Sequence, residues 1–227
     1  MERFFNTAGP IKPEWHYHVP TDTRWDYRNV VSLIQQSKYF ILHAPRQTGK
    51  TSGLLSLMHY LNQSEQFEAL YANIEPAQAA REDVPAAMAA IAGKIASRHE
   101  LYHNNNLLSS NWNNIYEKSK PHQVIEDLLT FWTKNASKPT ILFLDEVDTL
   151  IGDTLISLLR QLRAGYDKRP EFFPQSIILC GVRDIRDYRI HSSRSKEIIT
   201  GGSAFNIKAE SLRLSNFTKD QIAQLYQ

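Results

Sequence analysis

Residues 44–51 carry the residue types that proteins use to hold phosphate groups. The segment reads Ala-Pro-Arg-Gln-Thr-Gly-Lys-Thr and matches the P-loop pattern G-x-x-x-x-G-K-[ST], except that Ala44 replaces the first glycine. Such a loop needs inward-pointing backbone N–H groups, a helix N-terminus that favours anions, a lysine for the β- and γ-phosphates and a hydroxyl for Mg²⁺. We therefore predict a nucleotide-phosphate site. The residues expected to line it are Ala44, Pro45, Arg46, Gln47, Thr48, Gly49, Lys50, Thr51 and Ser52.

The segments on either side of this loop favour the phosphate-binding interpretation. From ordinary residue frequencies a Gly-Lys-Ser/Thr triplet occurs in roughly one chain in ten of this length, so the triplet alone could be a chance surface turn. Here it follows a strand-like run at 39–44 and precedes a segment at 50–62 whose apolar residues have helical spacing. Strand, loop and helix in this order are what phosphate binding requires.

A second chemical feature is the acidic pair at the end of the run 141–148, Ile-Leu-Phe-Leu-Asp-Glu-Val-Asp. Unpaired carboxylates are costly inside a buried strand, so we expect them at its carboxyl tip beside a cation or water. We predict that Asp145 holds Mg²⁺ together with Thr51, and that Glu146 polarises the water that attacks the γ-phosphate. The alternative is an acidic N-terminus for the following helix, which suits Asp148 better than the other two.

An arginine follows the fourth strand-like run, within Gly-Val-Arg-Asp-Ile-Arg-Asp-Tyr at 181–188. Arg183 is placed to sense or stabilise the charge of a γ-phosphate, and it completes the expected catalytic set with Lys50 and Glu146. Two alternatives stay open. Arg183 and Arg186 can pair with the neighbouring aspartates as a structural network. The other alternative is a nucleic-acid patch formed by the five cations of this region, Arg183, Arg186, Arg189, Arg194 and Lys196.

Three further arginines are candidates for an arginine finger that acts on a neighbouring subunit. Arg160 and Arg163 share one face of the predicted helix 149–165, and Arg169 follows it. A solvated helix face is the alternative interpretation of these residues.

The segment 9–20 contains three prolines, two histidines and the aromatic residues Trp15 and Tyr17. It is too irregular for a core element, so we expect either a strap that stacks on an adenine ring or a loop packed on the surface. Its histidines lack partners at a recognisable metal spacing, and the predicted metal site is therefore the one for Mg²⁺ alone. A helix is expected from a cap at Thr23 to Gln36.

Strand-like and helix-like segments alternate along the rest of the chain. The expected strands are 39–44, 67–75, 140–145 and 176–182, and the expected helices are 50–62, 84–101, 115–135 and 149–165, with polar loops at 103–106 and 109–114. This alternation predicts an α/β fold with a parallel sheet and helices on both faces. Ligands of such sheets bind beyond the carboxyl ends of the strands, where the predicted phosphate loop and acidic pair both lie.

Composition agrees with a folded domain. The 227 residues are 42% hydrophobic, enough for one sizeable core, and the single cysteine, Cys180, excludes an internal disulfide. No run approaches the roughly 20 apolar residues of a membrane span, so we expect a soluble cytoplasmic protein without a membrane partner. A net charge of +2 is too mild to indicate nucleic-acid binding by itself.

The motifs together resemble a known family. The segments that carry the resemblance are 5–10 (Phe-Asn-Thr-Ala-Gly-Pro), 44–51, 141–148, 180–188 and 205–208 (Phe-Asn-Ile-Lys). They resemble the AAA-like ATPase domains of prokaryotes, which are related to the archaeal ATPases and the STAND group of the AAA+ class. The resemblance implies an ASCE-type three-layer sandwich whose P-loop strand is flanked by the acidic strand and the sensor strand. It also implies that residues 21–26 stand near the adenine, although the glycine of the STAND box is missing here.

The resemblance also implies a domain organisation and a function. Residues 1–38 would form an N-terminal strap and helix, 39–210 the P-loop ATPase domain, and 211–227 the start of a truncated C-terminal helical lid. The last segment contains a strand and turn at 211–217 and a capping box at 218–221. We expect a slow ATPase that uses ATP and Mg²⁺ as a nucleotide switch and has a homo-oligomeric or regulatory protein partner. The alternatives are a nucleotide-binding module without useful hydrolysis and a nucleic-acid-associated AAA+ protein.

Overall fold

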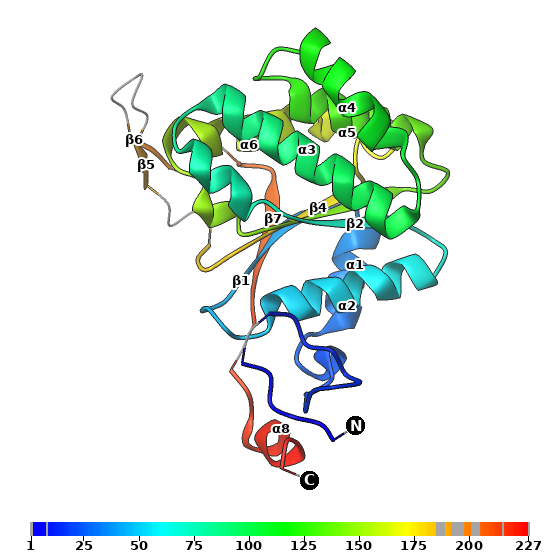
Figure 1. Ribbon diagram of the computed structural model, residues 1–227, viewed down its shortest axis with the longest axis vertical. Coiled ribbons are helices and arrows are strands. Elements are labelled where there is room, and N and C mark those ends of the chain that lie inside the picture. Colours follow the sequence, from blue (N-terminus) through cyan, green and yellow to red (C-terminus); the bar gives the residue numbers. More distant parts are fainter. Residues whose placement is uncertain are drawn as a thin grey trace.

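A parallel β-sheet lies at the centre of the computed structural model, with helices on both of its faces (Figure 1). The structure describes residues 2–7, 9–184, 189–191, 198–200, 205–214 and 216–226. The strands of this sheet are β1 (Tyr39–His43), β2 (Glu68–Asn73), β3 (Thr140–Asp145), β4 (Ser176–Gly181) and β7 (Lys208–Arg213). A separate antiparallel hairpin joins β5 (Arg189–His191) to β6 (Ile198–Thr200). The predicted parallel α/β class is confirmed.

The strand order is β2-β3-β4-β1-β7, and every neighbouring pair is parallel. The expectation that the acidic strand borders the P-loop strand is wrong, because β4 stands between β1 and β3. The helical crossover after β1 carries the chain past two strand positions before β2 joins the sheet. The tips of β1 and β3 are thus two strand spacings apart, about 10 Å, which leaves room for phosphate groups between them.

Helices cover the sheet as two layers. The helices are α1 (Tyr27–Gln35), α2 (Lys50–Gln63), α3 (Val84–His103), α4 (Leu107–Lys118), α5 (Val124–Asn135), α6 (Gly152–Ala164) and α8 (Lys219–Gln224), with 3-10 turns η1 (Thr21–Thr23), η2 (Glu75–Ala80), η3 (Val147–Thr149) and η4 (Tyr166–Lys168). One hydrophobic core lies under α1 and α2, and the other under α3, α5 and α6, with α4 packed beside α3. Successive side chains of a strand point to opposite faces of the sheet. Ile41 therefore lies in the core under α3, α5 and α6, whereas Phe40 and Leu42 lie in the core under α1 and α2.

The predicted single helix at 115–135 is wrong, because two helices occupy this region. α4 ends at Lys118 and α5 begins at Val124, and Pro121 lies in the turn between them. Proline lacks a backbone N–H and its ring disfavours helical backbone in the residue before it, which separates the two helices. The loop expected at 109–114 is also wrong, since these polar residues lie within α4, where Trp112 contacts Gly93 of α3. Packing overrides their weak helix propensity.

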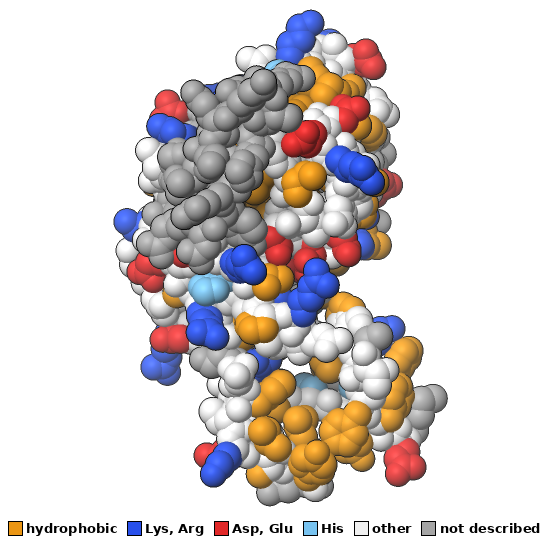
Figure 2. All heavy atoms as spheres, turned by 90° about the vertical axis from the view of Figure 1, so that its left-hand side faces the viewer, with side chains coloured by type: hydrophobic (Ala, Val, Ile, Leu, Met, Phe, Trp, Pro, Cys, Tyr) orange, Lys and Arg blue, Asp and Glu red, His pale blue; other side chains and the backbone are white. Residues whose placement is uncertain are grey.

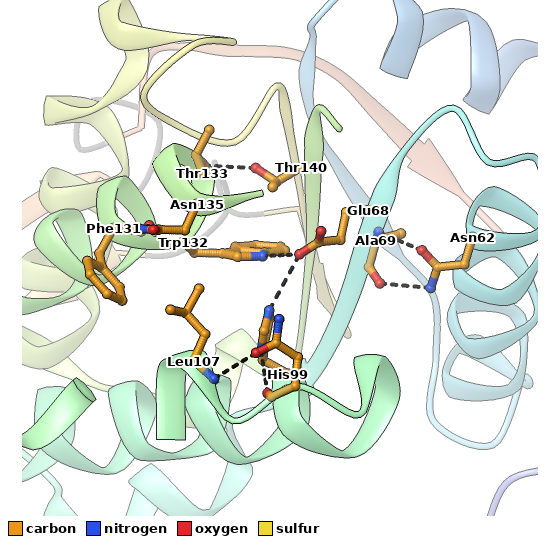
Figure 3. A network of polar contacts seen from close by, with 11 residues as sticks. Asn62, Glu68, Ala69, His99, Leu107, Phe131, Trp132, Thr133, Asn135 and Thr140 are labelled. Carbon is orange, nitrogen blue, oxygen red and sulfur yellow. Dashed lines mark hydrogen bonds and ion pairs between the residues drawn. The ribbon is translucent and has the colours of Figure 1, made fainter. Parts of the chain in front are cut away.

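A polar network ties β2 to the helices above it (Figure 3). The Oε1 atom of Glu68 accepts a hydrogen bond from Trp132 Nε1 at 2.5 Å and lies 3.4 Å from His99 Nε2. The hydroxyls of Thr133 and Thr140 meet at 2.9 Å and join α5 to β3. These contacts fix the positions of α3 and α5 over the sheet and give the partly buried Glu68 carboxylate its donors.

Near the C-terminus, β7 begins three residues before the strand and turn expected at 211–217 and ends within that range. The predicted capping box is confirmed, because the Thr218 side chain accepts from Gln221 N at 3.2 Å and the Gln221 side chain accepts from Thr218 N. α8 lies beside the N-terminal segment (Figure 1), where the rings of Phe5 and Tyr226 are 5.9 Å apart. None of the helices in the described ranges is long and apolar enough to span a bilayer.

Candidate functional site

The segment between β1 and α2 forms a loop with an open helix N-terminus. Two of its residues have left-handed backbone, Gln47 with φ of +59° and Gly49 with φ of +82°. The second position suits glycine, and a Cβ there would also lie 3.0 Å from a guanidinium nitrogen of Arg24. No side chain caps α2, which begins at Lys50. The first N–H groups of this helix can therefore bind an anion.

Lys50 is the loop's cation and is almost fully buried, with 6% of its surface exposed. Its Nζ atom donates to the carbonyl oxygens of Ala44 and Pro45, at 3.0 Å each. An ammonium group has three N–H donors, so one is left for a ligand. The remaining predicted loop residues lie around it, with Pro45, Arg46 and Gln47 exposed and Thr48, Thr51 and Ser52 partly buried.

The acidic strand meets the phosphate loop through Asp145, which has no exposed surface. Its Oδ2 atom accepts hydrogen bonds from Thr51 Oγ1 and from the Tyr71 hydroxyl, both at 2.8 Å, and its Oδ1 accepts from Glu146 N at 3.0 Å. Three donors thus satisfy a buried charge. The structure thus brings together Lys50, Thr51 and Asp145, although Thr51 and Asp145 are 94 positions apart in the sequence.

This donor set fits Mg²⁺. The Thr51 hydroxyl directs its proton to Asp145, which leaves its lone pairs free for a cation. Hard divalent cations prefer oxygen ligands, and Mg²⁺ keeps several waters that a nearby carboxylate can bind. Among the described residues Asp145 accepts three hydrogen bonds, which leaves about one of the roughly four acceptor positions of a carboxylate. That position suits a water bound to the ion.

Glu146 follows Asp145 and has left-handed backbone, with φ of +61°. Its side chain is partly buried. Burial raises the pKa of Glu146, the charges of Asp145 and Asp148 raise it further, and Lys50 opposes them. A carboxylate with a raised pKa accepts a proton more readily than an ordinary one, which suits a general base. Burial and the neighbouring Asp145 likewise raise the pKa of the Cys180 thiol, so this cysteine is a protonated core residue.

The end of β4 is held to the acidic segment by Asp148. Its Oδ2 atom accepts from Val182 N at 3.3 Å, and a Cβ on Gly181 would lie 2.9 Å from its Oδ1, so glycine allows this approach. Asp148 is the acidic residue in the first turn of η3, which follows β3, and it does not lie at the N-terminus of α6, which begins only at Gly152.

The predicted arginines have different surroundings. Arg183 is exposed after β4 and forms no ion pair within the described part of the chain, so the structure does not join it to the cluster around Lys50. Arg186 and the basic residues 194 and 196 lie outside the described residues. Arg160 and Arg163 are exposed on α6.

Arg169 is used within the fold. Its guanidinium lies over the rings of Tyr166, at 3.4 Å, and Tyr39, at 4.8 Å, and it donates to the carbonyl oxygen of Ser37. These contacts lie at the amino end of β1, opposite to the phosphate loop. These contacts engage the guanidinium within the fold, which favours a structural role for Arg169 over that of an arginine finger.

The N-terminal segment contacts the phosphate loop directly. Ile11 N donates to Ser52 Oγ at 3.0 Å, and Arg24 donates to the carbonyl oxygen of Thr48. The Arg24 guanidinium also lies 4.0 Å from the ring centre of Phe217, just before α8. Figure 2 shows hydrophobic side chains gathered on the lobe formed by the N-terminal and C-terminal segments.

The sequence analysis missed Tyr71. The available signal was a hydroxyl within an apolar strand, two residues before that strand ends, but its contact with Asp145 depends on the strand order.

Comparison with protein-family models gives no match, and comparison with curated proteins gives none. Solved structures do match. Cdc6p from Pyrobaculum aerophilum is 19% identical with a TM-score of 0.55, over 92% of this chain and 50% of that one. A chain in the structure of Drosophila ORC bound to poly(dA/dT) DNA and Cdc6 is 10% identical with a TM-score of 0.52, over 88% of this chain and 30% of that one. The chain shares with these structures the three-layer α/β fold of P-loop NTPases.

This fold accounts for the location of the cluster, since the P-loop after β1 and the acidic tip of β3 both lie at the carboxyl edge of the sheet. The chain spans half or less of the length of these two matched chains. At such low sequence identity the likeness concerns the fold, and the chemistry must be argued from the residues above.

Proposed function

We propose that this chain binds ATP with Mg²⁺ at residues 44–52 and hydrolyses it slowly, as a nucleotide-dependent switch of the AAA+ class. The observation that carries the proposal is the hydrogen bond of 2.8 Å from Thr51 to Asp145, which joins the phosphate loop to the acidic strand. A chance Gly-Lys-Thr turn would have no reason to contact a strand tip that carries two carboxylates. The AAA+ fold supports the same conclusion independently.

The phosphate groups would lie over the N-terminus of α2. The free N–H groups there and the third donor of Lys50 supply positive potential to the β- and γ-phosphates. When bound, Mg²⁺ would neutralise charge on the transferred phosphoryl group. Thr51 would bind it directly and Asp145 through water.

Hydrolysis requires a base and a group that responds to the γ-phosphate. Glu146 would orient and deprotonate the attacking water, in agreement with its partly buried position beside Asp145. Arg183 is exposed, which leaves its guanidinium available to the γ-phosphate or to a neighbouring subunit.

The switch would act through the segments that contact the loop. Arg24 touches Thr48 on one side and Phe217 on the other, so a shift of the phosphate loop is transmitted to the segment that leads into α8. We propose that residues 211–227 begin a lid whose position reports the bound nucleotide to a second copy of the chain or to a regulatory protein.

Titration calorimetry with a non-hydrolysable ATP analogue and MgCl₂ tests this function. Lys50→Ala should weaken binding about 100-fold, because it removes the buried cation that faces the phosphates. Lys118→Ala changes an exposed lysine of α4 and serves as the matched control, with unchanged affinity expected. Equal affinities of the wild-type chain and the Lys50→Ala variant, or no binding by the wild-type chain, would refute the proposal.

A further inference from the structure

Tyr71 reaches the candidate site from a strand that carries no part of the predicted motifs. Its ring lies in the core under α1 and α2, is 4% exposed, and belongs to β2, where it pairs in register with Phe143 of β3. Alternation along β3 places Asp145 on the same face as Phe143. The tyrosine hydroxyl therefore reaches the Asp145 carboxylate from the neighbouring strand and donates to Oδ2 at 2.8 Å.

The shared acceptor couples two hydroxyl groups. Tyr71 and Thr51 both donate to Asp145 Oδ2, while Oδ1 accepts from the backbone of Glu146. Each hydroxyl has one proton, so the carboxylate determines in which direction the Thr51 lone pairs point. The tyrosine bond opposes rotation of the carboxylate away from Thr51. It is also a charge-assisted bond in a site without exposed surface, where such bonds are strongest.

We propose that Tyr71 is a positioning residue for Mg²⁺ in nucleotide binding, which acts by holding the Asp145 carboxylate and through it the Thr51 hydroxyl. The inference rests on the proposed nucleotide site. Groups that orient the ligands of a metal commonly change its affinity about 10-fold to 100-fold when they are removed, although they never touch it. A plain structural tyrosine would affect folding and leave the response to Mg²⁺ unchanged.

The experiment measures how much Mg²⁺ strengthens binding of a non-hydrolysable ATP analogue. Calorimetry in EDTA and in saturating MgCl₂ gives two dissociation constants, and their ratio is the gain from Mg²⁺. Tyr71→Phe keeps the ring and removes the hydroxyl, so we expect wild-type affinity in EDTA and a gain about 10-fold smaller. Tyr71→Met is a second variant without a donor, for use if the first does not fold.

Tyr39→Phe is the matched control. Tyr39 is also a buried strand tyrosine, and its hydroxyl donates to the Pro174 carbonyl oxygen at 3.0 Å, at the other end of the sheet. Its removal should leave the gain from Mg²⁺ at the wild-type value. The inference is overturned if Tyr71→Phe keeps the full gain, or if it loses affinity equally in EDTA and in MgCl₂. A wild-type chain that binds no nucleotide would refute the proposed function as well, so the two failures are distinguishable.

Discussion

Asp145 carries a buried negative charge without an ion pair among the described residues. An isolated carboxylate in such a place is costly, and here hydroxyl and backbone donors offset the cost. The sequence predicted the acidic pair because two carboxylates follow four apolar residues. It could not predict Tyr71, because the contact depends on which strand lies beside β3. The pairing of β2 with β3 is a property of the folded sheet and leaves no local pattern in the chain.

Glu146→Gln should separate binding from hydrolysis. The amide keeps the size of the side chain but cannot accept a proton from water, so we expect hydrolysis to fall about 100-fold or more while affinity for the ATP analogue is retained. Phosphate release and calorimetry measure the two quantities. Glu82→Gln changes an exposed glutamate and is the control. Hydrolysis at the wild-type rate in Glu146→Gln would contradict the role as a base.

The pH dependence of this reaction is a further part of the same test. Burial and the neighbouring Asp145 and Asp148 raise the pKa of Glu146 above its ordinary value of 4.5. A base is active when deprotonated, so hydrolysis should fall as the pH drops through this raised pKa. The decline would thus begin at a higher pH than for an ordinary glutamate. The residual hydrolysis by Glu146→Gln should not show this decline at low pH.

At the scale of elements, the strands were predicted best. Continuous apolar runs gave β1, β3 and β4 almost to the residue, because strands buried on both faces need such runs. The helices were less predictable. The break between α4 and α5 was signalled by Pro121. In α4 the apolar residues Leu108, Trp112, Ile115 and Tyr116 have helical spacing and pack against the core, but the pattern was obscured by the polar residues between them. They become helical because α4 packs beside α3, a contact between elements that the sequence does not show.

Two helical glycines beside tryptophans give a matched pair of predictions. A Cβ on Gly53 in α2 would lie 2.5 Å from the Trp25 ring, whereas a Cβ on Gly93 in α3 would lie 3.5 Å from Trp112. Gly53→Ala should therefore cost about 1–3 kcal/mol through overpacking. Gly93→Ala should stabilise the chain by about 0.5–1 kcal/mol, because alanine favours a helix interior and finds ordinary contact there. Urea unfolding measures both. Changes of equal sign would contradict the packing argument.

At the scale of the whole molecule, the N-terminal segment and α8 lie side by side below α2 (Figure 1). Gln221 of α8 donates to the carbonyl oxygen of Thr23, and Arg24 lies between Phe217 and the loop. The sequence indicated an irregular N-terminal strap and a capped C-terminal helix, but gave no reason for them to touch. Contacts between positions nearly 200 residues apart come from the fold of the intervening sheet.

The same long-range packing makes stability depend on pH through the network over β2. Burial lowers the pKa of His103, and its Nε2 atom has no hydrogen-bond partner among the described residues. Burial alone would raise the pKa of Glu68, but hydrogen bonds from His99 and Trp132 outweigh it and lower the pKa. In both cases the unfolded chain takes up a proton at a higher pH than the folded one. Stability should thus fall as the pH drops below 6.5, the ordinary value for histidine, and again below 4.5, that of glutamate.

Urea unfolding at a series of pH values from 8 to 4 tests this dependence. His103→Gln removes the first titrating group, so the decline between about pH 7 and pH 5 should become shallower while the later decline remains. His59→Gln changes an exposed histidine of α2 and should keep the wild-type profile. If His103→Gln and the wild-type chain lose stability in parallel over this range, the buried histidine is not the cause. The first decline would then have to come from another titrating group.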